Sequence, residues 1–301
     1  MSAYLGELAA LATSVLFSAS STVNTLAGRK VGASVLNRTR LVLAIAWLIL
    51  AHALLRIPLP LLAGPERWFW LSVSGIVGLA IGDAFLFQAF IWIGPRLSML
   101  LMSLAPAISA ILAWILLGEV LSPGQWAGMA LTTFGIVWVI SDRKGNSRQN
   151  HIAKEHYMSG ILFGLGAAVG QALGLVLAKR GMFGDFSAIS GTLIRMLAAA
   201  LILWGITIFR RQTSQTIHQV VDDPRAAWLI VLGSIFGPFL GVTLSLYAVQ
   251  NTAVGVASTL TALPPIILLP VGYFFFKERF GWHSVLGTVL AMIGVFLLFR
   301  M

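Results

Sequence analysis

The sequence contains no cysteine and very few charged residues. Without cysteine, the chain can form no disulfide, no thiolate metal site and no cysteine nucleophile. Only 10% of its residues are charged, whereas soluble domains carry about 25%. Because 58% of the residues are hydrophobic, this composition predicts a protein whose main solvent is lipid.

Motifs of catalysis and metal binding are also missing from the sequence. It has no HExxH zinc motif and no paired-acid metal motif. The histidines are expected in loops or near span ends, away from any serine at depth. We therefore expect no catalytic residue, no metal and no cofactor, and an intramembrane enzyme is the distant alternative. The five histidines are His52, His151, His156, His218 and His283.

The net charge of +10 does not indicate a nucleic-acid partner, because no basic stripe accompanies a soluble fold. Loop lysines and arginines that face anionic lipid explain the sign. A bilayer-crossing helix needs about 20 apolar residues. The first residues lack a basic n-region and a cleavage-type break, so they indicate a retained span. The ten predicted spans are 6–27, 34–54, 68–92, 96–117, 124–141, 159–179, 187–209, 227–248, 254–276 and 283–300.

The two halves of the chain resemble each other. "LAPAISAILAWILLGE" (104–119) aligns with "LPPIILLPVGYFFFKE" (263–278) at an offset of 159 residues, and "RLVLA" (40–44) aligns with "RMLAA" (195–199). Several matches along nearly one register indicate an internal repeat. The offset of 159 pairs Pro106 with Pro265, Glu119 with Glu278, Gly82 with Gly241, Gly128 with Gly287 and Gly135 with Gly294.

The polar stretch at 142–157 is the natural linker between a first repeat at 1–141 and a second at 158–301. Five spans are an odd number, so the second repeat must enter the membrane upside down. Inverted repeats are typical of alternating-access transporters, whose binding site lies between the repeats near the bilayer midplane. The predicted fold is therefore an all-α membrane protein of ten transmembrane helices in two inverted five-helix repeats.

The sequence resembles the drug/metabolite transporter superfamily, and specifically its ten-helix EamA-type branch. The resemblance rests on the duplicated segment from proline to "GE", on "IGDAFLFQAF" (81–90) and on "GPRLSMLLMSLAP" (94–106). One departure is "KE" at 277–278, where the first half has "GE". The resemblance implies export of small metabolites, with amino acids, including aromatic ones, or drugs as candidates.

Asp83 is the only charged residue between Trp68 and Gly94. A charge at the centre of a spanning helix costs roughly 2.5–3.5 kcal/mol on insertion scales, so a polar environment must offset it. One interpretation makes Asp83 a substrate or proton site beside Phe87, which lies on the same helix face. The other makes it a structural acid that caps a helix or pairs with an arginine such as Arg195.

Other polar side chains in apolar spans are candidates for lining a central cavity, because a bilayer penalises unpaired amides and hydroxyls. Hydrogen bonding between helices is the alternative for each serine or threonine. Arg40 and Arg195 lie near span starts, and we expect them to snorkel to the headgroups. The substrate-binding candidates are Ser18, Asn24, Asp83, Phe87, Gln88, Gln171 and Tyr247.

Pro106 and Pro265 each remove a backbone donor inside an apolar span, and both halves have them. They are candidates for conformational hinges of the fourth and ninth spans, with a purely structural kink as the alternative. Glycines of the third and sixth spans, such as Gly78 and Gly170, predict close helix packing.

The sequence thus favours a secondary transporter that exports small metabolites by alternating access, as a monomer and with proton coupling as an option. Alternatives are a sugar, nucleotide-sugar or cationic drug transporter, or a channel. The expected partners are a small-molecule substrate and membrane lipids. The expected location is the bacterial inner membrane. The resemblance implies cytoplasmic termini, whereas the basic linker favours the opposite orientation under the positive-inside rule.

Overall fold

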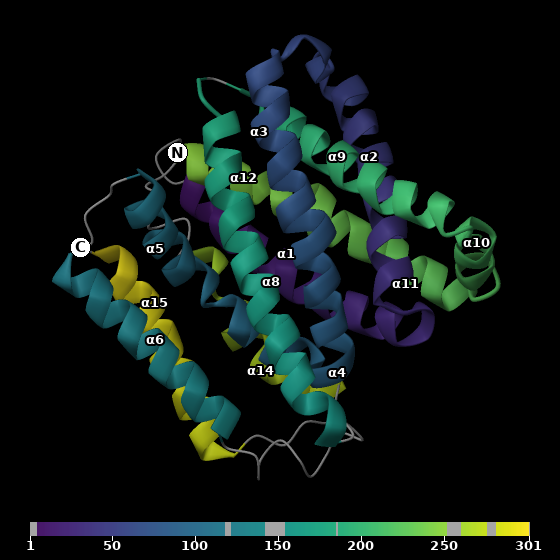
Figure 1. The fold of residues 1–301 in the computed structure, drawn as a ribbon. Helices are drawn as coiled ribbons and strands as arrows, with labels where there is room; N and C mark the ends of the chain where they lie inside the picture. The colour runs from purple at the N-terminus through teal and green to yellow at the C-terminus, as the bar shows by residue number, and fades with distance from the viewer. Residues whose placement is uncertain are drawn as a thin grey trace.

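The computed structural model describes residues 5–117, 122–141, 154–184, 186–251, 260–275 and 281–300. These residues form helices joined by turns and short connections, without a β-strand among them, which confirms the predicted all-α class (Figure 1). The first half contains α1 (Leu5–Val31), α2 (Ala33–Leu55), the 3-10 turn η2 (Pro60–Leu62), α3 (Pro65–Gly75), the π-helical segment η3 (Ile76–Gly82), α4 (Asp83–Met102), α5 (Ala105–Leu117) and α6 (Pro123–Ser141).

The second half has the same order of elements. It contains α8 (Lys154–Gly181), α9 (Ala188–Phe209), the short α10 (Thr213–Val221), α11 (Pro224–Ser234), the π-helical segment η4 (Ile235–Gly241), α12 (Val242–Asn251), α14 (Pro264–Phe275) and α15 (Trp282–Arg300).

Five helical segments of the described chain are long and apolar enough to span a membrane. They are Ala33–Leu55, Pro65–Met102, His156–Gly181, Ala188–Phe209 and Pro224–Ala248, and shorter apolar helices occur at Trp126–Val139 and Val285–Leu297. The exact count of ten spans stays a prediction, because 118–121, 252–259 and 276–280 lie outside the described residues. The same holds for Glu119, Glu278 and most of the predicted linker.

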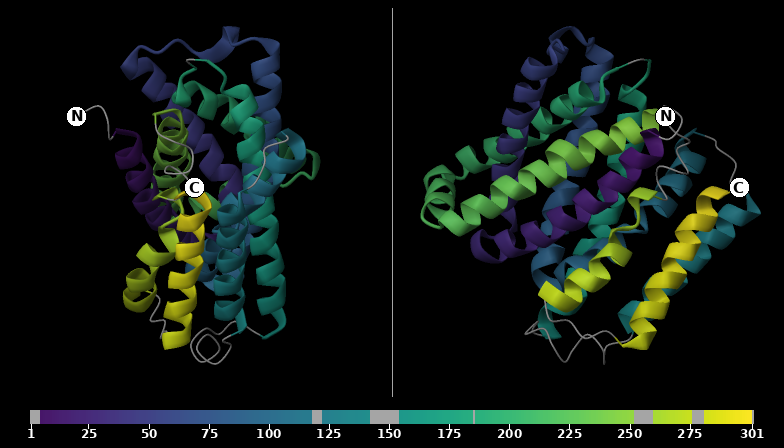
Figure 2. Two further views of the ribbon diagram at one scale, coloured as in Figure 1. Left: turned by 90° about the vertical axis from the view of Figure 1, so that its left-hand side faces the viewer. Right: turned by 180° about the vertical axis from the view of Figure 1, so that it is seen from behind.

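Helices of one repeat pack against helices of the other. α8 lies along α3, η3 and α4, while α1 lies along α11, η4 and α12, and α2 contacts α9. α6 and α15 lie side by side along one edge of the bundle (Figures 1 and 2). Gly135 faces Gly287 and Ala291, while Gly294 faces Gly128, so α6 and α15 run antiparallel. The first helix of each repeat thus packs against the same elements of the other repeat, as a two-fold relation between inverted halves requires.

Glycine makes one of these crossings possible. A Cβ on Gly170 would lie 2.8 Å from Gly82 Cα, and a Cβ on Gly174 would lie 2.9 Å from Gly78 Cα. The Ser74 hydroxyl also donates to the Gly174 carbonyl at 2.6 Å. The glycines therefore set the close approach of α8 to η3, as their spacing predicts.

Each repeat has a helix break at the same place, ahead of the paired proline. The Leu104 amide donates to the Leu101 carbonyl, and at the offset of 159 the Leu263 amide donates to the Leu260 carbonyl. Pro106 and Pro265 are the second residues of α5 and α14. A proline in the first turn of a helix has no hydrogen bond to lose. The break at 103–104 lies inside the predicted fourth span, and each proline lies just inside the helix that follows its break. Whether either proline acts as a hinge stays a prediction.

The two π-helical segments are also equivalent. η3 and η4 are both seven residues long, and the offset of 159 superposes them from first to last residue. π-turns are rare, and they cluster at functional sites. They widen the helix by one residue per turn and change which backbone carbonyls are free. No pattern in the sequence predicted these two π-helical segments.

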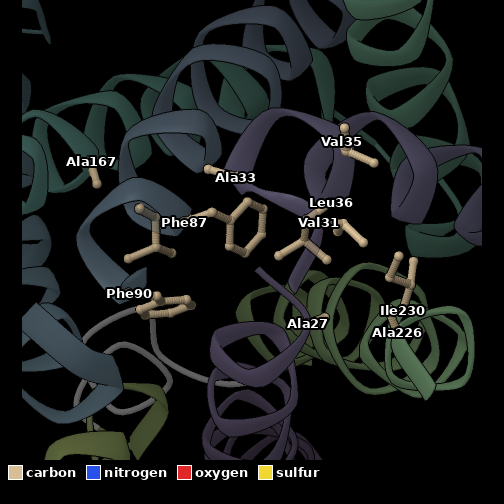
Figure 3. Close-up of a cluster of buried hydrophobic side chains, with 11 residues drawn as sticks. Ala27, Val31, Ala33, Val35, Leu36, Phe87, Phe90, Ala167, Ala226 and Ile230 are labelled. Atoms are coloured by element: carbon tan, nitrogen blue, oxygen red, sulfur yellow. The ribbon is translucent and has the colours of Figure 1, made fainter. Parts of the chain in front are cut away.

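A buried apolar cluster fills the end of the bundle where α1 turns into α2 (Figure 3). Phe87 and Phe90 of α4 contribute its largest side chains and are each 2% exposed. Val31 and Leu36 come from the α1–α2 turn, and Ile230 comes from α11. Phe87 follows Asp83 by one turn of α4, so the cluster lies next to the first residues of that helix.

Candidate functional site

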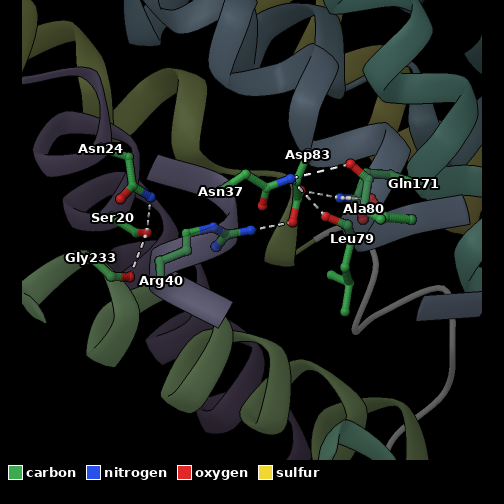
Figure 4. A network of polar contacts seen from close by, with 10 residues as sticks. Ser20, Asn24, Asn37, Arg40, Leu79, Ala80, Asp83, Gln171 and Gly233 are labelled. Atoms are coloured by element: carbon green, nitrogen blue, oxygen red, sulfur yellow. Dashed lines mark hydrogen bonds and ion pairs between the residues drawn. The ribbon is translucent and has the colours of Figure 1, made fainter. Parts of the chain in front are cut away.

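A buried ion pair occupies the middle of the bundle. Arg40 of α2 donates from Nη2 to Oδ2 of Asp83, the first residue of α4 (Figure 4). The two side chains are only 5% and 7% exposed. Opposite charges that lose water together retain their mutual attraction, which offsets part of the cost of burial. The pair therefore explains how a lone carboxylate can lie in the middle of an apolar span.

The π-helical segment η3 supplies further partners. Gln171 of α8 donates from Nε2 to Asp83 Oδ1 at 2.8 Å and also lies 3.4 Å from the Gly78 carbonyl. Asn37 of α2 donates from Nδ2 to the carbonyls of Leu79 and Ala80, each at 3.2 Å (Figure 4). Side-chain amides of α2 and α8 thus satisfy backbone oxygens of the π-turn, as burial in lipid requires. The acid and the π-turn form one hydrogen-bonded unit.

Phe87 lies one turn beyond Asp83 and packs beneath Arg40. The Arg40 Cζ atom is 4.4 Å from the centroid of the Phe87 ring. A guanidinium over an aromatic face gains attraction from the ring quadrupole, and the gain grows when water is excluded. Phe87 therefore holds Arg40 in place as well as filling the apolar cluster.

A second buried arginine, Arg195 of α9, approaches the same region and is 5% exposed. A Cβ on Gly75 would collide with the Arg195 carbonyl, so glycine is required where α3 meets α9. One guanidinium nitrogen, Nη2, lies 3.5 Å from the position that a Cβ on Gly78 would take. The negative charge of Asp83 attracts the Arg195 guanidinium. No described residue, however, forms an ion pair with Arg195.

A smaller polar group connects α1 to α11. Asn24 donates from Nδ2 to Ser20 Oγ at 2.9 Å, and Ser20 Oγ lies 3.4 Å from the Gly233 carbonyl (Figure 4). The Asn24 side-chain oxygen is buried without a hydrogen-bond partner among the described residues. Gly237 faces both Ser20 and Arg40, so this group continues the polar centre onto α1.

Comparison with known proteins agrees with this geometry. The model of the EamA-like transporter family matches residues 4–141 and 158–300, which together make up most of the chain. The chain belongs to the EamA-like transporter family. As a member, it is a transporter and an integral, multi-pass membrane protein.

Two individual proteins are similar to this EamA-like transporter. Protein LicB of Haemophilus influenzae (strain ATCC 51907 / DSM 11121 / KW20 / Rd) is 28% identical over 145 residues. That match spans about half of each chain, 47% of both. A solved structure described as "Crystal structure of protein" is 18% identical, has a TM-score of 0.66, and covers 98% of this chain and 97% of that one. The second likeness shows the fold.

In this EamA-like transporter, three of the residues predicted for the site come together. Asp83 is the acid of the ion pair, and Gln171 donates a hydrogen bond to it. Phe87 contacts the pair through the Arg40 guanidinium. Asn24 belongs to the neighbouring group on α1.

The three other candidates form no hydrogen bond to that centre in the part of the chain that the structure describes. The Ser18 hydroxyl donates within its own helix to the Ser14 carbonyl at 2.7 Å. Gln88 is half-buried, and the structure shows no hydrogen bond from it to the described centre. Tyr247 of α12 is 36% exposed. Whether any of the candidates binds substrate stays a prediction.

The predicted orientation of both arginines is wrong. We expected Arg40 and Arg195 to snorkel to the headgroups, but they are 4% and 5% exposed and point inward. Asp83 gives the physical reason, because an ionised acid at depth attracts cations that would otherwise reach water. The signal was present in the alignment, since these two arginines occupy equivalent places in the repeats.

Proposed function

We propose that this protein is a secondary carrier that moves small metabolites by alternating access between its two repeats. The leading candidates are amino acids, including aromatic ones, and the direction is export from the cytoplasm across a bacterial inner membrane. The observation that supports this proposal is the buried polar centre of Arg40, Asp83, Gln171 and Arg195 at the repeat interface. In transporters built from inverted repeats, the substrate binds at that location.

The elements around the centre suit a carrier. Two equivalent π-helical segments and two equivalent breaks lie on α3–α4–α5 and on α11–α12–α14. Each repeat therefore contains a helix that can change its local winding without losing all of its hydrogen bonds. Because both repeats have such a helix, the two repeats can exchange conformations, which supports a rocking motion of one against the other. A single chain contains both halves that this motion needs.

An enzyme would need a different arrangement. His52 Nε2 and Ser190 Oγ do lie 3.1 Å apart between α2 and α9. Both are buried, at 2% and 3% exposure, and His52 Nδ1 contacts the Leu48 carbonyl of its own helix. A substrate carbonyl has no access to this hydroxyl, so the contact is a helix–helix hydrogen bond.

Counterflow in proteoliposomes tests the proposal. Purified protein would be reconstituted with an excess of one unlabelled solute inside, and entry of the same labelled solute would be followed. The panel contains amino acids, neutral sugars and organic cations, and liposomes without protein are the control. We expect saturable entry that the internal solute accelerates, with amino acids the most active class. Currents that rise with concentration without saturation would indicate a channel instead.

A further inference from the structure

The two buried arginines occupy equivalent places, but only one of them has an acid on its own repeat. Arg40 pairs with Asp83 on the following span. The residue equivalent to Asp83 in the second repeat is Val242, which follows η4 just as Asp83 follows η3. The second repeat therefore has no carboxylate at the position from which Asp83 pairs with Arg40 in the first.

The packing around Val242 supports this equivalence. α9 contacts α12 in the second repeat, as α2 contacts α4 in the first. Val242 packs against the apolar cluster that contains Met196 and Ala199, the residues that follow Arg195 on its helix. Arg40 Nη1 and Arg195 Nη2 each lie 3.5 Å from the Cβ position of an equivalent glycine, Gly237 and Gly78 respectively.

The charges of this centre do not balance. Two guanidinium groups and one carboxylate leave a surplus of one positive charge in a region that is at least nine-tenths buried. Asp83 already accepts hydrogen bonds from Arg40 and Gln171. The Arg195 Nε atom is buried without a hydrogen-bond partner in the part of the chain that the structure describes. An uncompensated buried cation is costly, and an anion would relieve it.

We infer that the transported solute carries a carboxylate, and that Arg195 binds it in the place where the second repeat has Val242 instead of an acid. A guanidinium presents its donors in a planar fork that matches a carboxylate. The residues at the places equivalent to Asp83 and Gln171 are apolar, one on the second repeat and one on α1 of the first. Val242 stands for Asp83, and Phe17, which contacts Gly241, stands for Gln171.

The chemistry of the solute follows from these contacts. It is a small monocarboxylate with an apolar or aromatic body. An ammonium group is not required for recognition, because Asp83 is engaged by protein groups. This inference rests on the proposed carrier function and names the substrate class of the same site.

The test measures ligand-dependent melting of the purified protein in detergent with matched pairs of compounds. L-phenylalanine is compared with L-phenylalaninamide, and L-leucine with L-leucinamide, which differ only in the carboxylate. 3-Phenylpropanoate and phenethylamine separate the carboxylate from the ammonium, and chloride tests a simple anion. We expect stabilisation by the carboxylates alone. Equal stabilisation by acids and amides, or by chloride only, or by none of the compounds, would overturn the inference.

Variants identify the residue. Arg195→Met should weaken the affinity for the effective carboxylate roughly 10- to 100-fold, since charge-assisted hydrogen bonds contribute about 1.5–3 kcal/mol. Arg195→Lys keeps the charge without the fork and should lose less. Val242→Asp should place an internal carboxylate against Arg195 and abolish binding of the solute. Val242→Asn introduces a side chain of the same size as aspartate but without its charge, so this variant should still bind the solute. Carboxylate binding unchanged in Arg195→Met would overturn the assignment, and this variant decides if Val242→Asp does not fold.

The counterflow experiment separates this inference from the function on which it rests. If the wild-type protein exchanges amides, amines or sugars but no carboxylate, the carrier function stands and the inference falls. If it exchanges no solute at all, both fall.

Discussion

The two repeats have the same backbone features but different side chains at the centre. Both have a π-helical segment, a break before the paired proline and a buried arginine at the equivalent place. The first repeat adds an acid after its π-turn, Asp83, and the partner helix α8 supplies Gln171. After its own π-turn the second repeat has Val242, and α1 of the first repeat, which crosses that π-turn, has Phe17 at the place equivalent to Gln171. The backbone features are thus shared by the two repeats, whereas the charged and polar side chains at the centre are not.

The interfaces between the repeats differ in a similar way. Where α8 crosses η3, glycine meets glycine, and backbone lies against backbone. Where α1 crosses α11 and η4, glycines meet side chains: Gly233, Gly237 and Gly241 lie against Asn24, Ser20 and Phe17 respectively. The first crossing can yield only by moving whole helices, whereas the second can yield by rotating side chains.

The largest expected effect comes from Asp83. Asp83→Asn would leave Arg40 and Arg195 buried without a carboxylate, and we expect a loss of about 3–5 kcal/mol in the free energy of unfolding. Equilibrium unfolding in mixed detergent micelles measures it. Arg40→Met in the same chain should recover much of the loss, because it removes one of the uncompensated charges. Full stability of the single Asp83→Asn variant would show that the ion pair contributes little.

The next effect compares the two glycine crossings. Gly174→Ala forces a methyl group against the Gly78 backbone and should cost about 1–3 kcal/mol, as overpacking does. Gly237→Ala meets the Ser20 hydroxyl, which can rotate, so we expect about 0.5–1.5 kcal/mol from a weakened hydrogen bond. The melting temperatures of the two variants, measured side by side, check this order. A larger loss for Gly237→Ala would contradict the contrast drawn between the interfaces.

The paired prolines test the shared part of the two repeats. Pro106→Ala and Pro265→Ala should leave the melting temperature nearly unchanged, because each proline occupies the first turn of its helix. Alanine restores a donor that lets the preceding helix continue, so we expect turnover to fall several-fold with little change in half-saturation. Counterflow at a series of solute concentrations separates the two parameters. Unchanged rates in both variants and in the double variant would make the prolines structural.

The smallest expected effect concerns an exposed ion pair between α1 and the start of α11, away from the buried centre. Lys30 Nζ donates to Asp223 Oδ2 at 2.6 Å, and Asp223 also caps α11 through the Ala226 amide at 3.0 Å. The hydrogen bond from Lys30, followed by that from the backbone, lowers the pKa of Asp223 below its ordinary value. Its contribution to stability is therefore present above the ordinary pKa and is lost as pH falls through the lowered one.

Asp223→Asn keeps the cap and removes the charge, so it isolates the contact with Lys30. We expect a slightly lower melting temperature than wild type at pH 7, and no difference at a pH below the lowered pKa of Asp223. Melting curves of both proteins from pH 7 down to a pH below the lowered pKa of Asp223 check this. A difference that stays constant over the whole range would exclude titration of Asp223 as its cause.

The sequence predicted the fold class and the family because both depend on long-range patterns of apolar residues and on repeated prolines and glycines. It also placed Asp83 and Gln171 in one region, since a bilayer forces polar groups inward. It could not show that η3 and η4 are π-helical, because a π-turn depends on packing between helices. It also failed to orient Arg40 and Arg195. A long arginine side chain can reach either the headgroups or the core, and only the position of Asp83 decides between them.

The melting temperatures of Arg40→Met and Arg195→Met, measured together without added solute, test the central claim most directly. Both substitutions remove a guanidinium from equivalent positions in the two repeats and leave an apolar side chain of similar length. The account predicts that Arg40→Met destabilises strongly, because Asp83 loses its partner. It predicts that Arg195→Met melts close to wild type or above it, because the protein loses a buried cation that has no acid of its own. Equal losses in the two variants would contradict the claim that the symmetric backbone carries an asymmetric charge centre.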